Sequence, residues 1–241
     1  MSEICVENRE VVVPGDVLAR GMDYLPGFGT YRKNEDIIAC RLGLARVEGR
    51  ALKITPLSGR YLPKKNDVVI GRIIDITVSG WRLDINSAYS GMLMMKEASS
   101  DFIQKGADLT QYHKLDEYLV CKITNVTSQK LVDLTLKGPG LKKLTSGRII
   151  MVNPYKVPRI IGKGGSMVAM IKEATGCHII VGQNGIIWLK GTPKEETIAV
   201  RAIRKVEKEA HCEGLTVSVK ELLESETGKE VAVKNANNEG E

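Results

Sequence analysis

Long apolar runs are absent from this 241-residue chain, and aromatic residues make up only 5% of it. No apolar run approaches the ~20 residues that a membrane-spanning helix needs, so we expect no membrane partner. Residues 1–10 also lack the apolar stretch of a signal peptide. Because 43% of the residues are hydrophobic, the chain can still bury a core, and a length of this size allows two to three small domains.

Paired cysteines are absent too. The five cysteines are odd in number and scattered, which is typical of reduced thiols in a cytoplasm. Structural zinc sites usually carry cysteines two to four residues apart, and no such pair occurs. The three histidines are far apart in the sequence, and alternation or turns account for the aspartates on predicted strands. We therefore expect no metal site, no cofactor and no catalytic site.

The most distinctive feature that is present is a glycine loop at residues 162–165, with one lysine among three glycines. Pro158 favours a short helix before the loop, and apolar spacing after it favours a second helix that ends at Gly176. Glycine permits positive φ and leaves the backbone amides uncovered. A sugar-phosphate chain can then lie against the start of the second helix, where the dipole favours anions.

Three phosphate-binding motifs compete for this loop. A Walker A loop needs serine or threonine after its lysine, but Gly164 follows Lys163. A dinucleotide fingerprint counted from Gly162 needs a glycine where Met167 stands. The K-homology (KH) motif, Gly-x-x-Gly between two helices, grips single-stranded nucleic acid by its backbone and fits here. A flexible glycine turn is the alternative. The residues predicted to bind RNA at this loop are Arg159, Ile161, Gly162, Lys163, Gly164, Gly165 and Ser166.

The elements around the loop support the KH interpretation. We predict strands at 147–152, 178–181 and 186–190, and a final helix that begins with a capping box at 192–195. This β-α-α-β-β-α order is that of a type I KH domain, placed at residues 141–214. Residues 141–210 hold thirteen lysines and arginines but five glutamates, a net +8, whereas the rest of the chain sums to −2. The excess favours a polyanion partner, and a solvated charged surface is the alternative.

Residues 64–140 contain five strand-like runs and a long third connection, from residue 96 to 115. That pattern matches an OB-type barrel, whose second and third strands form the usual nucleic-acid platform. The segments VIGRI (69–73), GWRLDI (80–85) and GMLMMKE (91–97) resemble the S1 RNA-binding domain. The resemblance makes Trp81 and Arg82 candidate RNA-binding residues. Many S1 domains have phenylalanine where Arg82 stands and histidine where Met94 stands. Trp81 is either a stacking platform or part of the barrel wall.

Residues 1–63 are predicted to form a small β-rich domain, with strands at 9–13, 37–40, 42–47 and 51–55. A loop at 26–31 places one aromatic residue between two glycines. Such a loop either anchors a protein partner or caps the local core. Its candidate partner-binding residues are Pro26, Gly27, Phe28, Gly29 and Tyr31. At the other end, residues 215–241 are a C-terminal extension. Apolar and polar residues alternate over 215–223, and residues 224–241 are predicted to be disordered.

The sequence therefore predicts a multidomain protein, mainly β with an α+β part. From about residue 12 to 214 it resembles the RNA-binding cap subunits of the archaeal exosome, of the ribosomal RNA processing protein 4 type. VVPGD (12–16), PGFGTY (26–31) and GKGGSM (162–167) carry that resemblance. It implies three non-catalytic copies on a hexameric ring of RNase PH-like subunits, which bind single-stranded RNA and feed 3′ ends inward.

Two other functions remain open at this point. An S1–KH transcription elongation or termination factor has similar domains, but such factors usually carry a second KH domain, for which the residues after 214 are too few. A stand-alone ribonuclease is the third hypothesis. The paralogous exosome cap protein carries a zinc ribbon, which the absence of paired cysteines excludes.

Overall fold

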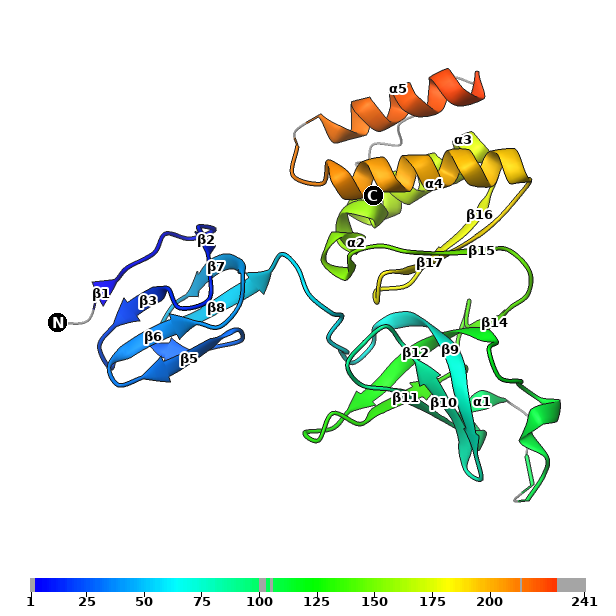
Figure 1. Ribbon diagram of the computed structural model, residues 1–241, viewed down its shortest axis with the longest axis horizontal. Helices are drawn as coiled ribbons and strands as arrows, with labels where there is room; N and C mark the ends of the chain where they lie inside the picture. Colours follow the sequence, from blue (N-terminus) through cyan, green and yellow to red (C-terminus); the bar gives the residue numbers. More distant parts are fainter. Residues whose placement is uncertain (1–2, 100–102, 105, 213, 229–241) are drawn as a thin grey trace, which may run out of the picture. The chain divides into compact units, whose positions relative to one another are not determined.

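The computed structural model describes residues 3–99, 103–104, 106–212 and 214–228 (Figure 1). Contacts divide the chain into two compact units, Met1–Gly59 and Arg60–Glu241. The N-terminal unit consists of strands and turns, and the described helices all belong to the C-terminal unit. Within the described ranges, no helix is long and apolar enough to cross a bilayer.

The N-terminal unit has two four-stranded sheets, ordered β1-β3-β6-β5 and β2-β7-β8-β4. Residues from both sheets share one core, which includes Leu18, Ile37 and Ile54. The β-rich prediction is confirmed, but four of these strands were not predicted. One of them, β5, has half-exposed residues alternating with exposed ones, so its sequence carries no buried stripe. The strands are β1 (Glu3–Ile4), β2 (Val11–Val12), β3 (Val17–Arg20), β4 (Leu25–Pro26), β5 (Thr30–Lys33), β6 (Asp36–Ala39), β7 (Gly43–Glu48) and β8 (Ala51–Pro56).

The first half of the C-terminal unit is a closed barrel of five strands, as predicted. The strand order is β13-β11-β10-β9-β12, and β13 also pairs with β12, which closes the barrel. Its strands are β9 (Val68–Thr77), β10 (Gly80–Asp84), β11 (Gly91–Met94), β12 (Tyr118–Val126) and β13 (Val132–Thr135). The long connection between β11 and β12 contains α1 (Met95–Ala98) and the 3₁₀ turn η1 (Leu109–Gln111). A sixth strand, β14 (Lys142–Leu144), pairs with β12 outside the closed barrel.

The second half has the predicted β-α-α-β-β-α order of a KH fold. Its antiparallel sheet is ordered β15-β17-β16. The elements are β15 (Arg148–Met151), the 3₁₀ turn η2 (Pro154–Lys156), α2 (Val157–Ile161), the 3₁₀ turn η3 (Lys163–Gly165), α3 (Ser166–Thr175), β16 (His178–Val181), β17 (Ile186–Lys190) and α4 (Pro193–Lys208). The predicted capping box begins α4: the side chain of Thr192 accepts from the backbone of Glu195, and the Glu195 side chain accepts from the backbone of Thr192.

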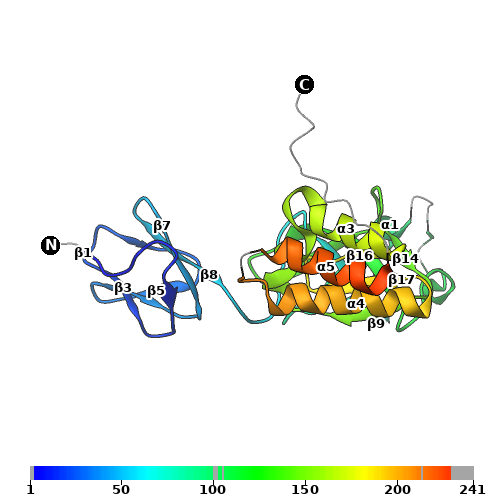
Figure 2. The same cartoon turned by 90° about the horizontal axis from the view of Figure 1, so that it is seen from above.

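A fifth helix, α5 (Leu215–Thr227), corrects the prediction for the C-terminal extension. Leu215, Val219 and Leu223 are buried at four-residue spacing and join the core of the KH fold. Figures 1 and 2 both show α5 lying along α4. The prediction of disorder from Glu224 is thus wrong for residues 224–227, since the helix whose apolar period begins at Leu215 continues to Thr227. Residues 229–241 of that prediction lie outside the described residues.

A buried asparagine joins the barrel to the KH fold. Asn184, in the turn between β16 and β17, is 0% exposed. Its Oδ1 accepts from the backbone N–H of Ile70 at 3.3 Å, and its Nδ2 donates to the carbonyl oxygens of Ile70 at 2.7 Å and Ile85 at 2.9 Å. An apolar cluster at the same junction consists of Ile70, Val120, Ile186 and Trp188. The predicted hairpin turn is present, but its role in docking the two folds was not predicted.

Candidate nucleic-acid interface

The glycine loop joins α2 to α3, as the sequence predicts. Gly162, Gly164 and Gly165 have φ values of 78°, 61° and 83°. Residues with side chains seldom adopt positive φ, so three of the four loop positions favour glycine on conformational grounds alone. Of the four residues that form the turn, only Lys163 has a side chain that can cover the backbone.

The two outer glycines differ in what a side chain would meet. A Cβ atom on Gly162 would lie 2.7 Å from the backbone nitrogen of Met167 and 2.8 Å from the Cβ of Met167. A Cβ atom on Gly165 would meet no atom within 4 Å. Gly162 is therefore required by packing as well as by φ, whereas Gly165 leaves open space before the first turn of α3. That space lets a phosphate group approach the backbone.

Positive charge surrounds this open backbone. Lys163 is exposed, and it forms no ion pair within the described part of the chain. Arg159 is exposed as well, and its guanidinium donates to the carbonyl oxygen of Cys212 at 3.4 Å. The N-cap of α3, Gly165, provides no side-chain hydrogen bond, so the dipole of the helix favours an anion at this end. The N–H groups of Gly165 and Ser166 donate to the carbonyl oxygens of Gly162, at 3.2 Å, and of Lys163. The loop residues predicted from the sequence thus lie together at the turn between α2 and α3, and their role in RNA binding stays a prediction.

Partly buried apolar side chains adjoin the loop. Ile161 precedes it and Val168 follows it, and both pack against the core of the KH fold without being fully buried. Ser166, also half-buried, is the first residue of α3. Apolar side chains, a backbone that no side chain covers and cations together suit a single strand, which offers unstacked bases as well as phosphates.

Trp81 is not part of any such surface. Its side chain is 0% exposed inside the barrel, and its Nε1 donates to the carbonyl oxygen of His113 at 3.1 Å. The indole ring packs edge to face against the imidazole of His113, with 5.2 Å between the ring centroids. Burial lowers the pKa of His113. The prediction of Trp81 as an RNA-binding residue is therefore wrong, and the barrel-wall alternative is right. Along β10, Trp81 and Leu83 point inward, which leaves Arg82 outward.

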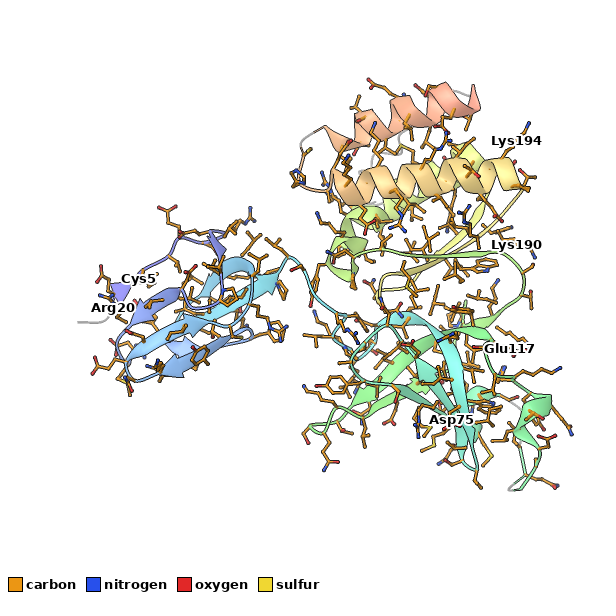
Figure 3. The ribbon with its side chains drawn as sticks, in the orientation of Figure 1. Cys5, Arg20, Asp75, Glu117, Lys190 and Lys194 are labelled. Carbon is orange, nitrogen blue, oxygen red and sulfur yellow. The ribbon has the colours of Figure 1, made fainter. Side chains whose placement is uncertain are left out.

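Arg82 lies on the outer face of the barrel, apart from the glycine loop in the sequence. Its Nη2 is 3.8 Å from Oδ2 of Asp75, the cross-strand residue on β9, which is labelled in Figure 3. Both side chains are about half exposed, at 47% and 51%, so solvent weakens this pair. Met94, at the end of β11, is 40% exposed. At these two positions the face therefore offers a weakly paired cation and a methionine in place of aromatic rings.

In the N-terminal unit, the predicted aromatic loop is a tight turn between strands. Pro26 ends β4 and Tyr31 lies in β5, so only residues 27–29 form the turn. Phe28 is 49% exposed, and the guanidinium of Arg41 lies 5.1 Å from its ring centre. Tyr31 is 46% exposed. The core-capping alternative holds for Tyr24, which packs against the core, and not for Phe28 or Tyr31.

A basic hollow beside the KH sheet was not predicted. Its volume is about 530 Å³. Its lining residues are Lys142, Lys143, Leu144, Thr145, Lys172, His178, Ile179, Ile180, Trp188 and Lys190. The lysines belong to the basic excess counted in the sequence, but they come from three separate elements, and no spacing in the sequence groups them. Across the described ranges, no three His, Cys, Asp or Glu side chains are grouped to hold a metal ion.

Comparison with known proteins agrees with this geometry. The KH domain model matches residues 147–205, and the model of the RRP4 S1 domain matches residues 60–107. Exosome complex component Rrp4 of Methanothermobacter thermautotrophicus is 42% identical over 237 residues, covering 98% of this chain and 75% of the relative. Its counterpart in Thermococcus kodakarensis is 40% identical over 227 residues, covering 92% and 88%.

A solved structure described as that of a putative exosome complex RNA-binding protein superposes with a TM-score of 0.64 and 34% identity. It covers 70% of this chain and 97% of the solved one. The likeness in sequence extends over all three parts of the chain, since the relatives match more than nine-tenths of it. The chain therefore belongs to the family of exosome complex component Rrp4.

Proposed function

We propose that this protein is the RNA-binding cap subunit of an exosome and binds single-stranded RNA through its glycine loop. The loop geometry carries the proposal: three glycines at positive φ, an exposed lysine, and the uncapped start of α3. The relatives are named as components of the exosome complex, and the similar solved structure is described as an RNA-binding protein. The cap binds RNA and carries out no chemistry itself.

The proposed partner is a hexameric ring of phosphorolytic, RNase PH-like subunits in the cytoplasm, which takes three copies of this chain. The ring performs the cleavage, and the cap feeds 3′ ends into it. The half-exposed side chains of Phe28 and Tyr31 support docking through the N-terminal unit, because they leave apolar surface for a partner to cover. Arg82 contributes to RNA tracking on the barrel.

The affinity of the full chain for single-stranded RNA is expected to fall steeply with salt, by about 0.7 log units per log unit of salt for each phosphate neutralised. Arg82→Ala is expected to reduce that slope by roughly 0.7, because it removes one phosphate contact. Fluorescence anisotropy at several salt concentrations measures both. Arg20→Ala is the matched control, since Arg20 faces Asp36 across strands at 4.0 Å in the N-terminal unit (Figure 3). If Arg82→Ala and Arg20→Ala show the same slope of log affinity against log salt, Arg82 makes no contact with the RNA.

The variant Phe28→Ala/Tyr31→Ala is expected to weaken assembly with the ring while RNA affinity of the free chain stays near wild type. Burial of one phenylalanine contributes roughly 1.5–3 kcal/mol, so a loss of tenfold or more in association is expected. Sedimentation with purified ring subunits measures the assembly. Tyr112→Ala/Leu115→Ala removes exposed apolar side chains from the barrel side, 42% and 56% exposed, and serves as the control. Intact assembly with lost RNA binding would assign RNA recognition to the N-terminal unit.

Two measurements separate this function from the alternatives. A transcription factor of the S1–KH kind would bind RNA but would not co-sediment with the ring subunits. A stand-alone ribonuclease would degrade labelled RNA in proportion to its amount through every purification step. Single-strand binding, ring association and no intrinsic degradation are the results that the cap function requires.

A further inference from the structure

We propose that the basic hollow beside the KH sheet is a second phosphodiester-binding site, which holds the same RNA strand some nucleotides away from the glycine loop. This inference rests on the proposed RNA-binding function and extends it. The hollow is composite: β14, the edge strand paired to the barrel, supplies one wall, and the KH sheet and α3 supply the other. Neither fold alone would form it.

The sheet alternation explains which side chains meet in the hollow. His178 and Lys190 are directly opposite each other on β16 and β17, and so are Ile180 and Trp188. These four side chains share the sheet face turned away from the helices, because Ile179 and Leu189 between them are buried in the helix-covered core. In the sheet order, β16 is an edge strand, which leaves this corner open.

The lining carries positive charge without acidic groups. Four of its ten residues are lysines, and none is aspartate or glutamate. Lys143 is neutralised by Glu117 on the barrel, with Nζ 2.6 Å from Oε1. In Figure 3, Glu117 is labelled on the barrel and Lys190 on the KH fold. No ion pair is formed by Lys142, Lys172 or Lys190 within the described ranges.

Three unpaired lysines around a concave surface repel one another, and a polyanion relieves that repulsion. The floor of the hollow is apolar, since Leu144, Ile180 and Trp188 are half-buried or buried there. Trp188 is 6% exposed, and its Nε1 donates to the carbonyl oxygen of Ser146 at 2.8 Å, so it supports the floor and does not stack on a base. The site therefore favours backbone phosphates over base recognition.

The position of the hollow favours RNA over an acidic protein segment. Lys172 lies on α3, the helix that starts at the glycine loop, and it is exposed near the last turn. Lys172 is six residues after Ser166, so roughly 9 Å of helix separates it from the glycine loop, a distance that a short single strand can cover. One strand would then contact the glycine loop at the start of α3 and the lysines of the hollow near its last turn.

The test compares two lengths of fluorescein-labelled single-stranded RNA on the full chain. The triple variant Lys142→Ala/Lys172→Ala/Lys190→Ala is expected to weaken binding of an RNA of about 12 nucleotides on the order of tenfold and to reduce its salt slope by about 2. An RNA of about 4 nucleotides, enough for a Gly-x-x-Gly loop, is expected to bind the variant and the wild type alike.

A charge-matched control is Lys33→Ala/Lys64→Ala/Lys194→Ala, which removes three exposed lysines outside the hollow and the loop. It is expected to change the affinity for the longer RNA less than about threefold. An equal loss for both RNA lengths, or an equal loss in the control, would overturn the second site and leave the RNA-binding function standing. Lost binding of a polyglutamate probe with unchanged RNA binding would instead assign the hollow to an acidic protein partner. A wild-type chain with no affinity for either RNA would overturn the proposed function itself.

Discussion

The double variant Lys163→Asp/Gly164→Asp is expected to bind single-stranded RNA about 100-fold more weakly than wild type, because two carboxylates replace a cation and a bare amide where phosphates approach. Gly164 has φ 61° and ψ 18°, a left-handed conformation that aspartate tolerates better than most residues. Lys163 and Gly164 are both exposed, so neither substitution places a side chain in the core. Fluorescence anisotropy with the full chain measures the loss, and thermal unfolding checks that the fold is retained.

These two positions make a sharper test than the outer glycines. A side chain on Gly162 would press on Met167, which is buried. Weaker RNA binding by a Gly162 variant would therefore have two causes, partial unfolding and a blocked phosphate contact. The matched control is Lys33→Asp/Gly49→Asp in the N-terminal unit. Gly49 has φ 60°, and a Cβ atom there would meet no atom within 4 Å, so the two variants have the same chemistry and comparable backbone strain. RNA affinity that falls equally in both variants would exclude the glycine loop as the binding site.

The substitution Asn184→Ala is expected to lower the free energy of unfolding of the C-terminal unit by about 3 kcal/mol or more. Alanine has no polar side-chain group, so the backbone N–H of Ile70 and the carbonyl oxygens of Ile70 and Ile85 lose their partner in a buried junction. Each unsatisfied buried group costs roughly 1–3 kcal/mol. In a unit of this size the melting temperature is expected to fall by roughly 10 °C, as measured by calorimetry.

Asn125→Ala is the control for that experiment. Asn125 is exposed, and its side chain makes one hydrogen bond, to Oδ2 of Asp133 at 3.4 Å. Its substitution is expected to change stability by less than about 0.5 kcal/mol. If Asn184→Ala melts like wild type, the amide network does not hold the two folds together. A split into two transitions for Asn184→Ala would support the network as the source of their joint unfolding.

Local sequence patterns predicted the strands and helices that bury one face, and the loop that needs glycine to turn. The KH order followed from the Gly-x-x-Gly loop, the capping box at Thr192 and the apolar stripe of α4, each of which depends on neighbours within a few residues. The five barrel strands were predicted from runs in which apolar residues alternate with polar ones. Strands β1, β4 and β5 were missed because none of their residues is buried, and β3 because its two buried residues are adjacent and do not alternate. Helix α5 was missed because a short apolar segment fits either period.

Local residue identity specifies the glycine loop, since positive φ, a backbone that no side chain covers and a lone lysine depend on four adjacent residues. It also determined the barrel and KH folds and the excess of positive charge. The burial of Trp81 depends on the packing of the barrel, because alternation specifies opposite faces of a strand without saying which face is inside. Only the tertiary structure placed Asn184 against the barrel and gathered Lys142, Lys172 and Lys190 around one hollow. Those arrangements depend on contacts between elements far apart in the chain, and no local spacing encodes such contacts.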